Sequence, residues 1–320
     1  MPIITIFVIL AVAPLFTKNE YVFRLLLMSL FFGAQAMAFD FTTGFINVVN
    51  FGFAGFLGLG AYTSALLVID LGLSTWLGFA AGAVAAGILG FLTGLLTLRL
   101  RGIYAACMAW FVQLALMGLV TVNVDLTRGA LGLTVPAALD TTSTVPYLYI
   151  LLLMALGIYI VLSIMIHSNL GLAFRAIGQN LLAARTSGIN PTRYKLINWT
   201  VACTFAGLLG GFYAHFIGIL TPDIMHFKHT VEILALAYIG GRGTLWGGLV
   251  TAFLVIPVME YLKPLMEIRL IIYGLLLILV MIFYPRGFAG ILQRIGELIK
   301  SRSRTRPGRP QGIAPTTAME

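Results

Sequence analysis

Residues 76–98 read WLGFAAGAVAAGILGFLTGLLTL, a stretch without a charged residue. An α-helix needs about 20 apolar residues to cross the hydrocarbon layer of a membrane, so this stretch is long enough to span one. Small residues recur at every fourth position, which aligns them on one side of the helix: Gly78, Gly82, Ala86, Gly90 and Gly94. Because close van der Waals packing holds helices together in lipid, we predict a transmembrane helix whose small residues contact another helix.

Similar apolar runs follow one another along the chain. They lie near residues 3–16, 21–40, 44–69, 76–98, 102–122, 146–167, 195–219, 230–241, 244–262 and 268–284. Of the 320 residues, 60% are hydrophobic and 10% are charged, whereas soluble domains carry about 25% charged residues. The runs are continuous, without the alternation typical of a transmembrane β-barrel. The sequence therefore predicts an all-α fold, a polytopic transmembrane helical bundle of about 8–10 membrane segments, with the short runs 3–16 and 230–241 as half-helices or re-entrant segments.

The formal net charge of +9 comes from Lys and Arg in short loops and near the end of the chain. Such a distribution is typical of cytoplasmic loops and of contact with anionic lipid, so we expect no nucleic-acid partner. We predict a transmembrane domain over residues 1–290 and a basic, disordered cytoplasmic tail over 291–320. Residues 1–10 lack the basic start of a secretory signal, so the first apolar run should remain as a membrane segment.

The longest informative polar stretch between apolar runs is HSNLGLAFRAIGQNLLAARTSGINPTRYK, residues 167–195. Its middle, from Phe174 to Ser187, has helical propensity and is followed by Gly188 and Pro191, which end helices. We predict a short helix on the cytoplasmic surface that contacts another protein. The alternative is an ordinary solvated connector.

Residues in this loop resemble a known coupling motif. Ala183-Ala184-x-x-x-Gly188 is similar to the EAA-type motif with which importer permeases dock on their ATPase subunits, with Leu182 at the position of the motif's Glu. Five further blocks resemble the LivM-type permeases of branched-chain amino-acid ABC transporters, in the order of that family. They are NFGFAGFLGLGAY (50–62), RLRGIY (99–104), LTRGALGL (126–133), EILA with GGRGTLWG (232–235, 240–247) and YGLLL with PRG (273–277, 285–287).

The resemblance implies a permease subunit in the bacterial cytoplasmic (inner) membrane. It implies a sister permease, two cytoplasmic ATPase subunits and an extracytoplasmic solute-binding protein as partners, and branched-chain or similar small amino acids as solutes. Urea and short amides are the alternatives among related permeases. The resemblance implies a cytoplasmic coupling loop over residues 168–195. The residues expected to dock on the ATPase are Arg175, Leu182, Ala183, Ala184, Arg185 and Gly188. No G-x-x-x-x-G-K-[ST] phosphate loop occurs, so we expect no cofactor in this chain and ATP on partner subunits.

A glycine-rich segment is our candidate for the lining of a solute path. Asn47 and Asn50 would share one face of a helix, and the glycines after them would let backbone approach a solute. The candidates are Asn47, Asn50, Gly52, Gly55, Gly58, Gly60, Tyr62 and Glu232. The alternative for the two asparagines is plain interhelical hydrogen bonding. For Glu232 we favour capping of the N-terminus of the short 230–241 helix.

The remaining polar residues do not indicate an enzyme. No Ser–His, Cys–His or paired-carboxylate arrangement is evident inside the apolar runs, so we expect no catalytic residue. His226 and His229 have a metal-compatible spacing but no evident third ligand, and no metal site is expected. A self-contained secondary carrier is the rival function, and it would need Asp40 or Glu232 to couple ions. The polar loop 123–145 is a candidate dock for a binding protein.

Overall fold

The computed structural model describes residues 19–262, apart from 98, 99, 101, 102, 140 and 142, together with 268–283 and a few single positions. The apolar run 3–16, the two arginines of the RLRGIY block and the basic tail lie outside the described residues. The described elements are α2 (Glu20–Thr43), α3 (Phe53–Leu71), α4 (Thr75–Thr97), α5 (Ile103–Val122), α6 (Val124–Thr127), η1 (Gly129–Leu131), β1 (Leu133–Thr134), α7 (Val145–His167), α8 (Asn169–Gln179), α9 (Leu181–Thr186), α10 (Pro191–Ile217), β2 (Ile219–Leu220), η2 (Pro222–Met225), α11 (Phe227–Gly240), α12 (Trp246–Tyr261) and α13 (Ile268–Phe283).

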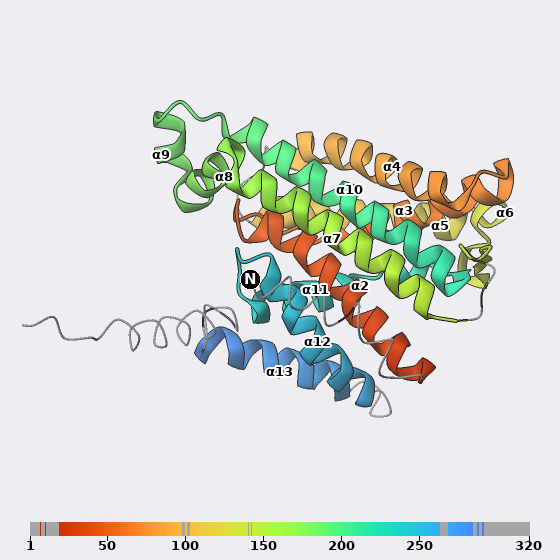
Figure 1. Ribbon diagram of the computed structural model, residues 1–320. Helices are drawn as coiled ribbons and strands as arrows, with labels where there is room; N and C mark the ends of the chain where they lie inside the picture. Colours follow the sequence, from red (N-terminus) through yellow and green to blue (C-terminus); the bar gives the residue numbers. More distant parts are fainter. Residues whose placement is uncertain are drawn as a thin grey trace, which may run out of the picture.

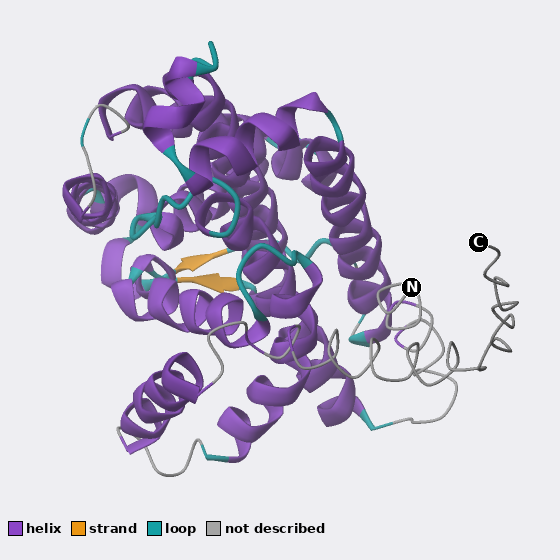
Figure 2. Cartoon of the chain, turned by 90° about the vertical axis from the view of Figure 1, so that its left-hand side faces the viewer, coloured by secondary structure: helices purple, strands orange, loops and turns teal. Residues whose placement is uncertain are grey.

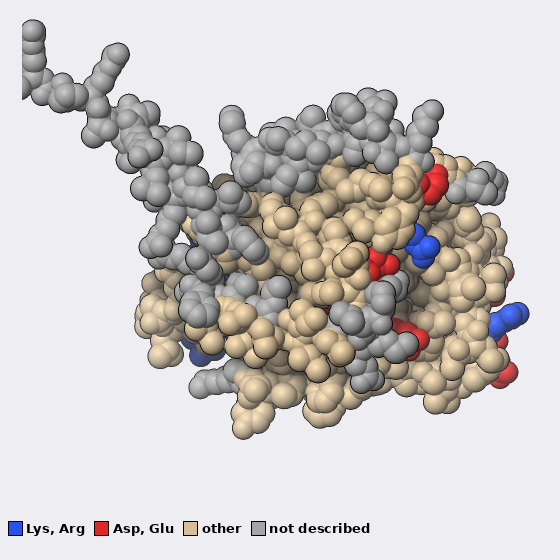
Figure 3. All heavy atoms as spheres, turned by 90° about the horizontal axis from the view of Figure 1, so that it is seen from below, with Lys and Arg blue, Asp and Glu red and all other residues tan. Residues whose placement is uncertain are grey.

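The fold class is confirmed. Within the described residues, six helices are long and apolar enough to cross a membrane: α2, α3, α4, α5, α7 and α10. The shorter helices α11, α12 and α13 accompany them. The long helices lie side by side, and α8 and α9 project from one end of the bundle (Figure 1). Charged side chains are sparse on the face seen in Figure 3, as expected for a surface in contact with lipid.

The two ends of the bundle differ in structure. The end with α8 and α9, called here the α9 end, also holds the C-terminus of α2, since the ring of Phe41 packs on that of Phe174 in α8 at 5.6 Å. Near the opposite end, β1 and β2 pair antiparallel, with Leu133 facing Leu220. Figure 2 shows these two short strands among the helices. The fold therefore has two projecting short helices at one end and a small strand pair toward the other.

The small residues of α4 form the predicted helix contact. All five, from Gly78 to Gly94, are buried, and they face α3 and α10. A Cβ atom on Gly82 would meet the backbone of Gly60, and one on Gly207 would meet Ala86. Three helices thus approach backbone to backbone, and the packing prediction for this stretch is confirmed.

Replacing Gly60 with alanine is expected to destabilise the protein by about 3 kcal/mol, because the new methyl group would clash with the backbone of Gly207 and neither rigid helix can yield. The matched control is Gly157→Ala on α7, where an added Cβ meets nothing within 4 Å. The measurement is the fraction of monodisperse protein after heating in detergent. Equal thermal stability of the two variants would contradict this account of the packing.

Two crossings of the bundle are only partly helical. After α2 ends, residues 44–52 contain no helix, and α3 begins at Phe53. The predicted continuous run 44–69 is therefore wrong in its first part. Within the segment, Asn47 adopts a left-handed φ of 57°, and the side-chain oxygen of Asn50 accepts a hydrogen bond from the N–H of Gly52 at 3.1 Å, which competes with helix formation. Gly44 also lies against the backbone of Gly243, which is remote in the sequence.

The second discontinuous crossing runs from residue 218 to Gly240. Its first part comprises β2 and η2, and only the second part is a helix, the 14-residue α11. The short run predicted at 230–241 is thus a half-helix completed by irregular backbone. Lipid does not tolerate exposed irregular backbone, so such a segment must be enclosed by protein or line a water-filled space.

The starts of α3 and α11 meet near the middle of the bundle. Ala86 is the central residue of α4, and it contacts Gly207, which in turn contacts Gly60 on α3. At 1.5 Å per residue, Ala54 lies about 9 Å from Gly60 along α3. The N–H of Ala54 donates to the hydroxyl of Thr230 in α11 at 3.1 Å. The two half-helices therefore begin within about 9 Å of the bundle's mid-depth.

Candidate functional site

The projecting loop consists of two helices. We predicted one helix from Phe174 to Ser187, but the chain breaks at Asn180, whose backbone is extended. The side-chain oxygen of Asn180 accepts hydrogen bonds from the N–H groups of Leu182 and Ala183, at 3.0 and 3.1 Å. An asparagine is a preferred N-cap, and here it ends α8 and starts α9. The single-helix prediction is therefore wrong.

The residues predicted to dock on an ATPase differ in their solvent exposure. Leu182 is 72% exposed, whereas Ala184 is 2% exposed. The others are exposed: Arg175, Ala183, Arg185 and Gly188. Ala184 therefore faces the protein and supports α9, while Leu182 and Ala183 present an outward surface. The docking role of all six residues stays a prediction.

The helix before α9 is held firmly by the bundle. The fully buried ring of Phe174 packs edge-on against Phe41 of α2 and lies 6.4 Å from the ring of Tyr194 in α10. A Cβ atom on Gly178 would meet the backbone carbonyl of Phe45. Movement of α9 would consequently be passed to α2, α10 and the irregular segment after α2.

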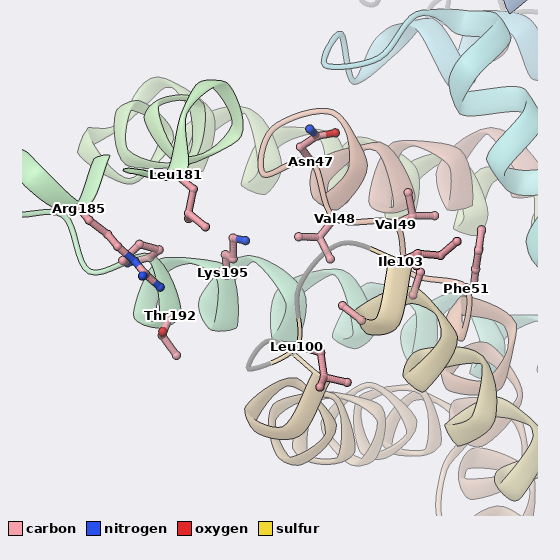
Figure 4. A pocket seen from close by; sticks show the side chains of 13 residues that line it. Asn47, Val48, Val49, Phe51, Leu100, Ile103, Leu181, Arg185, Thr192 and Lys195 are labelled. Carbon is pink, nitrogen blue, oxygen red and sulfur yellow. The ribbon is translucent and has the colours of Figure 1, made fainter. Parts of the chain in front are cut away.

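A cavity of about 640 Å³ lies between α9, α10, the N-terminus of α5 and residues 47–51. Figure 4 shows Leu181 and Lys195 pointing toward the space beside Val48. Arg185 also lines the cavity, and none of the lining residues is acidic. The cavity places α9 next to one of the two discontinuous crossings.

The two asparagines predicted to share a helix face do not do so. Asn47 is exposed, and its side-chain oxygen accepts a hydrogen bond of 2.6 Å from the guanidinium of Arg242. Asn50 is fully buried, and its amide points at the sulfur of Cys203, 3.8 Å away. The expectation that they lie on one helix is wrong, because residues 47–50 are not helical. A path-lining role for them stays a prediction.

The buried carboxylate of Asp40 holds the loop between α11 and α12. The backbone N–H groups of Gly243, Thr244 and Leu245 donate to it at 2.9 to 3.2 Å. Asp40 is 1% exposed, so its role in this structure is to satisfy three N–H groups just before α12. Sequence reasoning singled out Asp40 only as a possible ion-coupling carboxylate. The glycine-rich GGRGTLWG block was the signal that a backbone nest lay nearby.

The glycines of the candidate path segment lie at close contacts within the chain. A Cβ atom added to Gly52 would contact Ala109, and one added to Gly55 would contact Gln113. A Cβ atom added to Gly58 would contact Met225, and one added to Gly60 would contact Gly207. The hydroxyl of Tyr62 donates to the carbonyl of Leu220 at 3.4 Å. These residues therefore fix α3 against α5, η2 and α10. Their role in lining a path stays a prediction.

Glu232 does not cap a helix. Since α11 begins at Phe227, Glu232 lies beyond its first turn, and His226 is the N-cap, accepting from the N–H of Lys228 at 3.4 Å. The capping prediction is wrong. The carboxylate of Glu232 lies 4.0 Å from the ring of His229. The other ring nitrogen of His229 donates to the side-chain oxygen of Gln35 at 2.9 Å. In the described part of the chain, no three metal-ligating side chains gather.

Comparison with known proteins identifies the family. Residues 21–283 match the family model described as branched-chain amino acid transport system / permease component. The chain belongs to this permease family.

Curated relatives of the permease agree with this assignment. High-affinity branched-chain amino acid transport system permease protein LivM is 26% identical to the chain in both Salmonella typhimurium and Escherichia coli, over 87% of the chain and 72% of the relative. The LivH protein of Salmonella typhimurium is 26% identical over 80% of the chain and 90% of the relative. No solved structure gives a significant match. The chain is therefore a multi-pass membrane permease and not an enzyme.

Proposed function

We propose that this permease forms half of the translocation path of an ATP-driven importer for branched-chain or similar small amino acids in the bacterial inner membrane. The observation that carries the proposal is the family match over residues 21–283. The relatives LivM and LivH are named as permease proteins of high-affinity branched-chain amino acid transport systems. The projecting α8–α9 unit supplies the lever that such a machine needs.

The proposed partners follow from the same assignment. Two cytoplasmic ATPase subunits would grip α9 through Leu182 and Ala183, and a sister permease would complete the path. A solute-binding protein would dock near the opposite end, where loop 123–145 carries β1. Basic side chains near the α9 end support a cytoplasmic position for that end: Arg175, Arg185, Arg193 and Arg242. The basic tail 291–320 would then lie in the cytoplasm beside anionic lipid.

The proposed transmission runs from α9 into the irregular segment after α2. A push on the outward face of α9 would move α8, which packs on Phe41 and Phe45 through Phe174 and Gly178. Residues 47–51, which line the cavity beside α9, would then shift relative to α10. Packed helices change position as rigid bodies, so a small displacement at the surface would reach mid-depth.

Reconstitution tests the proposed function. With a sister permease, the ATPases and the binding protein in proteoliposomes, we expect uptake of radiolabelled leucine that requires both ATP and the binding protein. The control replaces the ATPase with a variant that binds but does not hydrolyse ATP, which should stop uptake. Uptake driven by an ion gradient without ATP would overturn the proposal in favour of a secondary carrier.

A further inference from the structure

Three polar side chains of the η2–α11 junction are exposed near the mid-depth of the bundle. They are Asp223, His226 and Lys228. Between them, the side chain of Met225 contacts Gly58 on α3, which lies two residues, or about 3 Å, from the mid-depth residue Gly60. The junction therefore lies within the length of the bundle, between the level of Gly60 and that of Ala54, where lipid or another subunit would surround it.

Neither charge of this junction has an ion-pair partner in the part of the chain that the structure describes. Among the described residues, no acidic side chain lies within 4.0 Å of Lys228, and no basic one lies within that distance of Asp223. A charged side chain at this depth is costly in lipid, so such residues face the interior of a bundle or a water-filled path. The exposed face of the junction must consequently be turned toward a path or another subunit.

Aromatic side chains connect the junction with the inner cavity. The ring of Phe227 lies 5.7 Å from that of Phe51 and 5.4 Å from that of Trp110 on α5. Phe51 also lines the cavity next to α9. Moreover, α5 is the least buried of the six long helices, with 22% of its apolar window buried. A polar junction, an aromatic cluster and a cavity therefore follow one another from mid-depth toward the α9 end.

A buried amide beside the junction lacks a hydrogen-bond partner. Gln113 is 1% exposed, and its oxygen accepts from the hydroxyl of Thr230 in the first turns of α11. Its nitrogen has no partner within the described residues. A buried donor without an acceptor is rare in proteins. The nitrogen is shielded from solvent in this structure, so a solute could reach it only if the junction opened.

We infer that the Pro222–Thr230 junction recognises a zwitterionic solute in the translocation path. The ammonium of Lys228, with the positive end of α11, would bind the carboxylate of an amino acid, and the carboxylate of Asp223 would bind its ammonium group. The rings of Phe227 and Trp110 would contact an apolar side chain. This inference rests on the proposed function, since it names the residues and the substrate class of the same path.

Charge-neutralising substitutions test the inference in the complete transporter. In proteoliposomes, Asp223→Asn and Lys228→Met should each lower leucine uptake about tenfold or more, the loss expected for one charge-assisted contact. Lys228→Arg should retain most of the uptake. Asp70→Asn, an exposed carboxylate at the end of α3, is the matched control and should leave uptake unchanged. Retained uptake in Lys228→Met would overturn the inference.

Cysteine labelling separates a solute site from a contact between subunits. In a Cys107→Ala background, where Cys203 is fully buried, Asp223→Cys and Lys228→Cys should react with a water-soluble methanethiosulfonate, and leucine should slow the reaction. Absence of labelling, or loss of the sister permease from the purified complex, would overturn the inference. If wild-type protein shows no ATP-dependent uptake, the proposed function fails, while leucine protection in this assay still reports on the site.

Discussion

Replacing Leu182 with lysine is expected to abolish co-purification of this permease with its ATPase partners. Leu182 is 72% exposed at the start of α9, and an apolar side chain of this kind fits a groove of a partner. Burying an ammonium group there without a counter-charge would cost several kcal/mol of binding, enough to lower the affinity by about two orders of magnitude or more. The measurement is the amount of ATPase retained on an affinity-tagged permease.

The control for this variant changes an equally apolar surface residue at a distance from α9. Leu131→Lys introduces the same charge at an 85% exposed position in η1 and should leave ATPase binding intact. Ala184→Glu is a different experiment: Ala184 is buried, so that variant would disturb the fold of α9 itself. Stoichiometric ATPase on Leu182→Lys would contradict a docking role for this surface.

Replacing Asp40 with alanine is expected to destabilise the permease by about 3 kcal/mol. The substitution leaves the N–H groups of Gly243, Thr244 and Leu245 buried without an acceptor, and hydrogen bonds to a buried charge are among the costliest to remove. The loop before α12 would lose its attachment to α2. The measurement is the midpoint of heat-induced aggregation in detergent, compared with wild type.

Two further variants make the Asp40 result specific. Asp40→Asn keeps one acceptor oxygen but turns an amide donor toward backbone donors, so an intermediate loss is expected. Asp70→Asn removes a charge at an exposed site and should change stability by less than about 0.5 kcal/mol. Wild-type stability of Asp40→Ala, accompanied by lost transport, would instead favour a role for this carboxylate in ion coupling.

The errors of the sequence analysis share a cause. The run 44–69 is apolar throughout, and hydropathy alone does not separate a continuous helix from half a helix preceded by extended chain. The break depends on the hydrogen bond that the side chain of Asn50 accepts from the N–H of Gly52. It also depends on the close backbone contact of Gly44 with Gly243, which is remote from it in the sequence. Likewise Glu232 was placed at a helix start, because nothing in the local sequence revealed that α11 begins at Phe227.

The depth of the η2–α11 junction was largely invisible from the sequence. The segment PDIMHFK reads as a polar loop between two apolar runs, and such a loop would ordinarily lie at the membrane surface. Its depth follows only from the packing of Met225 on Gly58 and of Thr230 on the first turn of α3. His226 and His229 attracted attention as a metal pair, whereas the neighbouring Asp223 and Lys228 did not.

The sequence by itself determined the all-α membrane class, the positions of most spanning helices, the small-residue contact of α4 and the family. These properties depend on hydropathy, spacing and motif order, which are local in the chain. Only the tertiary structure decided where the crossings are broken and which face of α9 is exposed. It also decided that the carboxylate of Asp40 accepts hydrogen bonds from the backbone N–H groups of residues 243–245. Each of these depends on partners more than 100 residues away or on burial by other helices, because a buried polar group takes whichever partner the packed fold brings within hydrogen-bond distance.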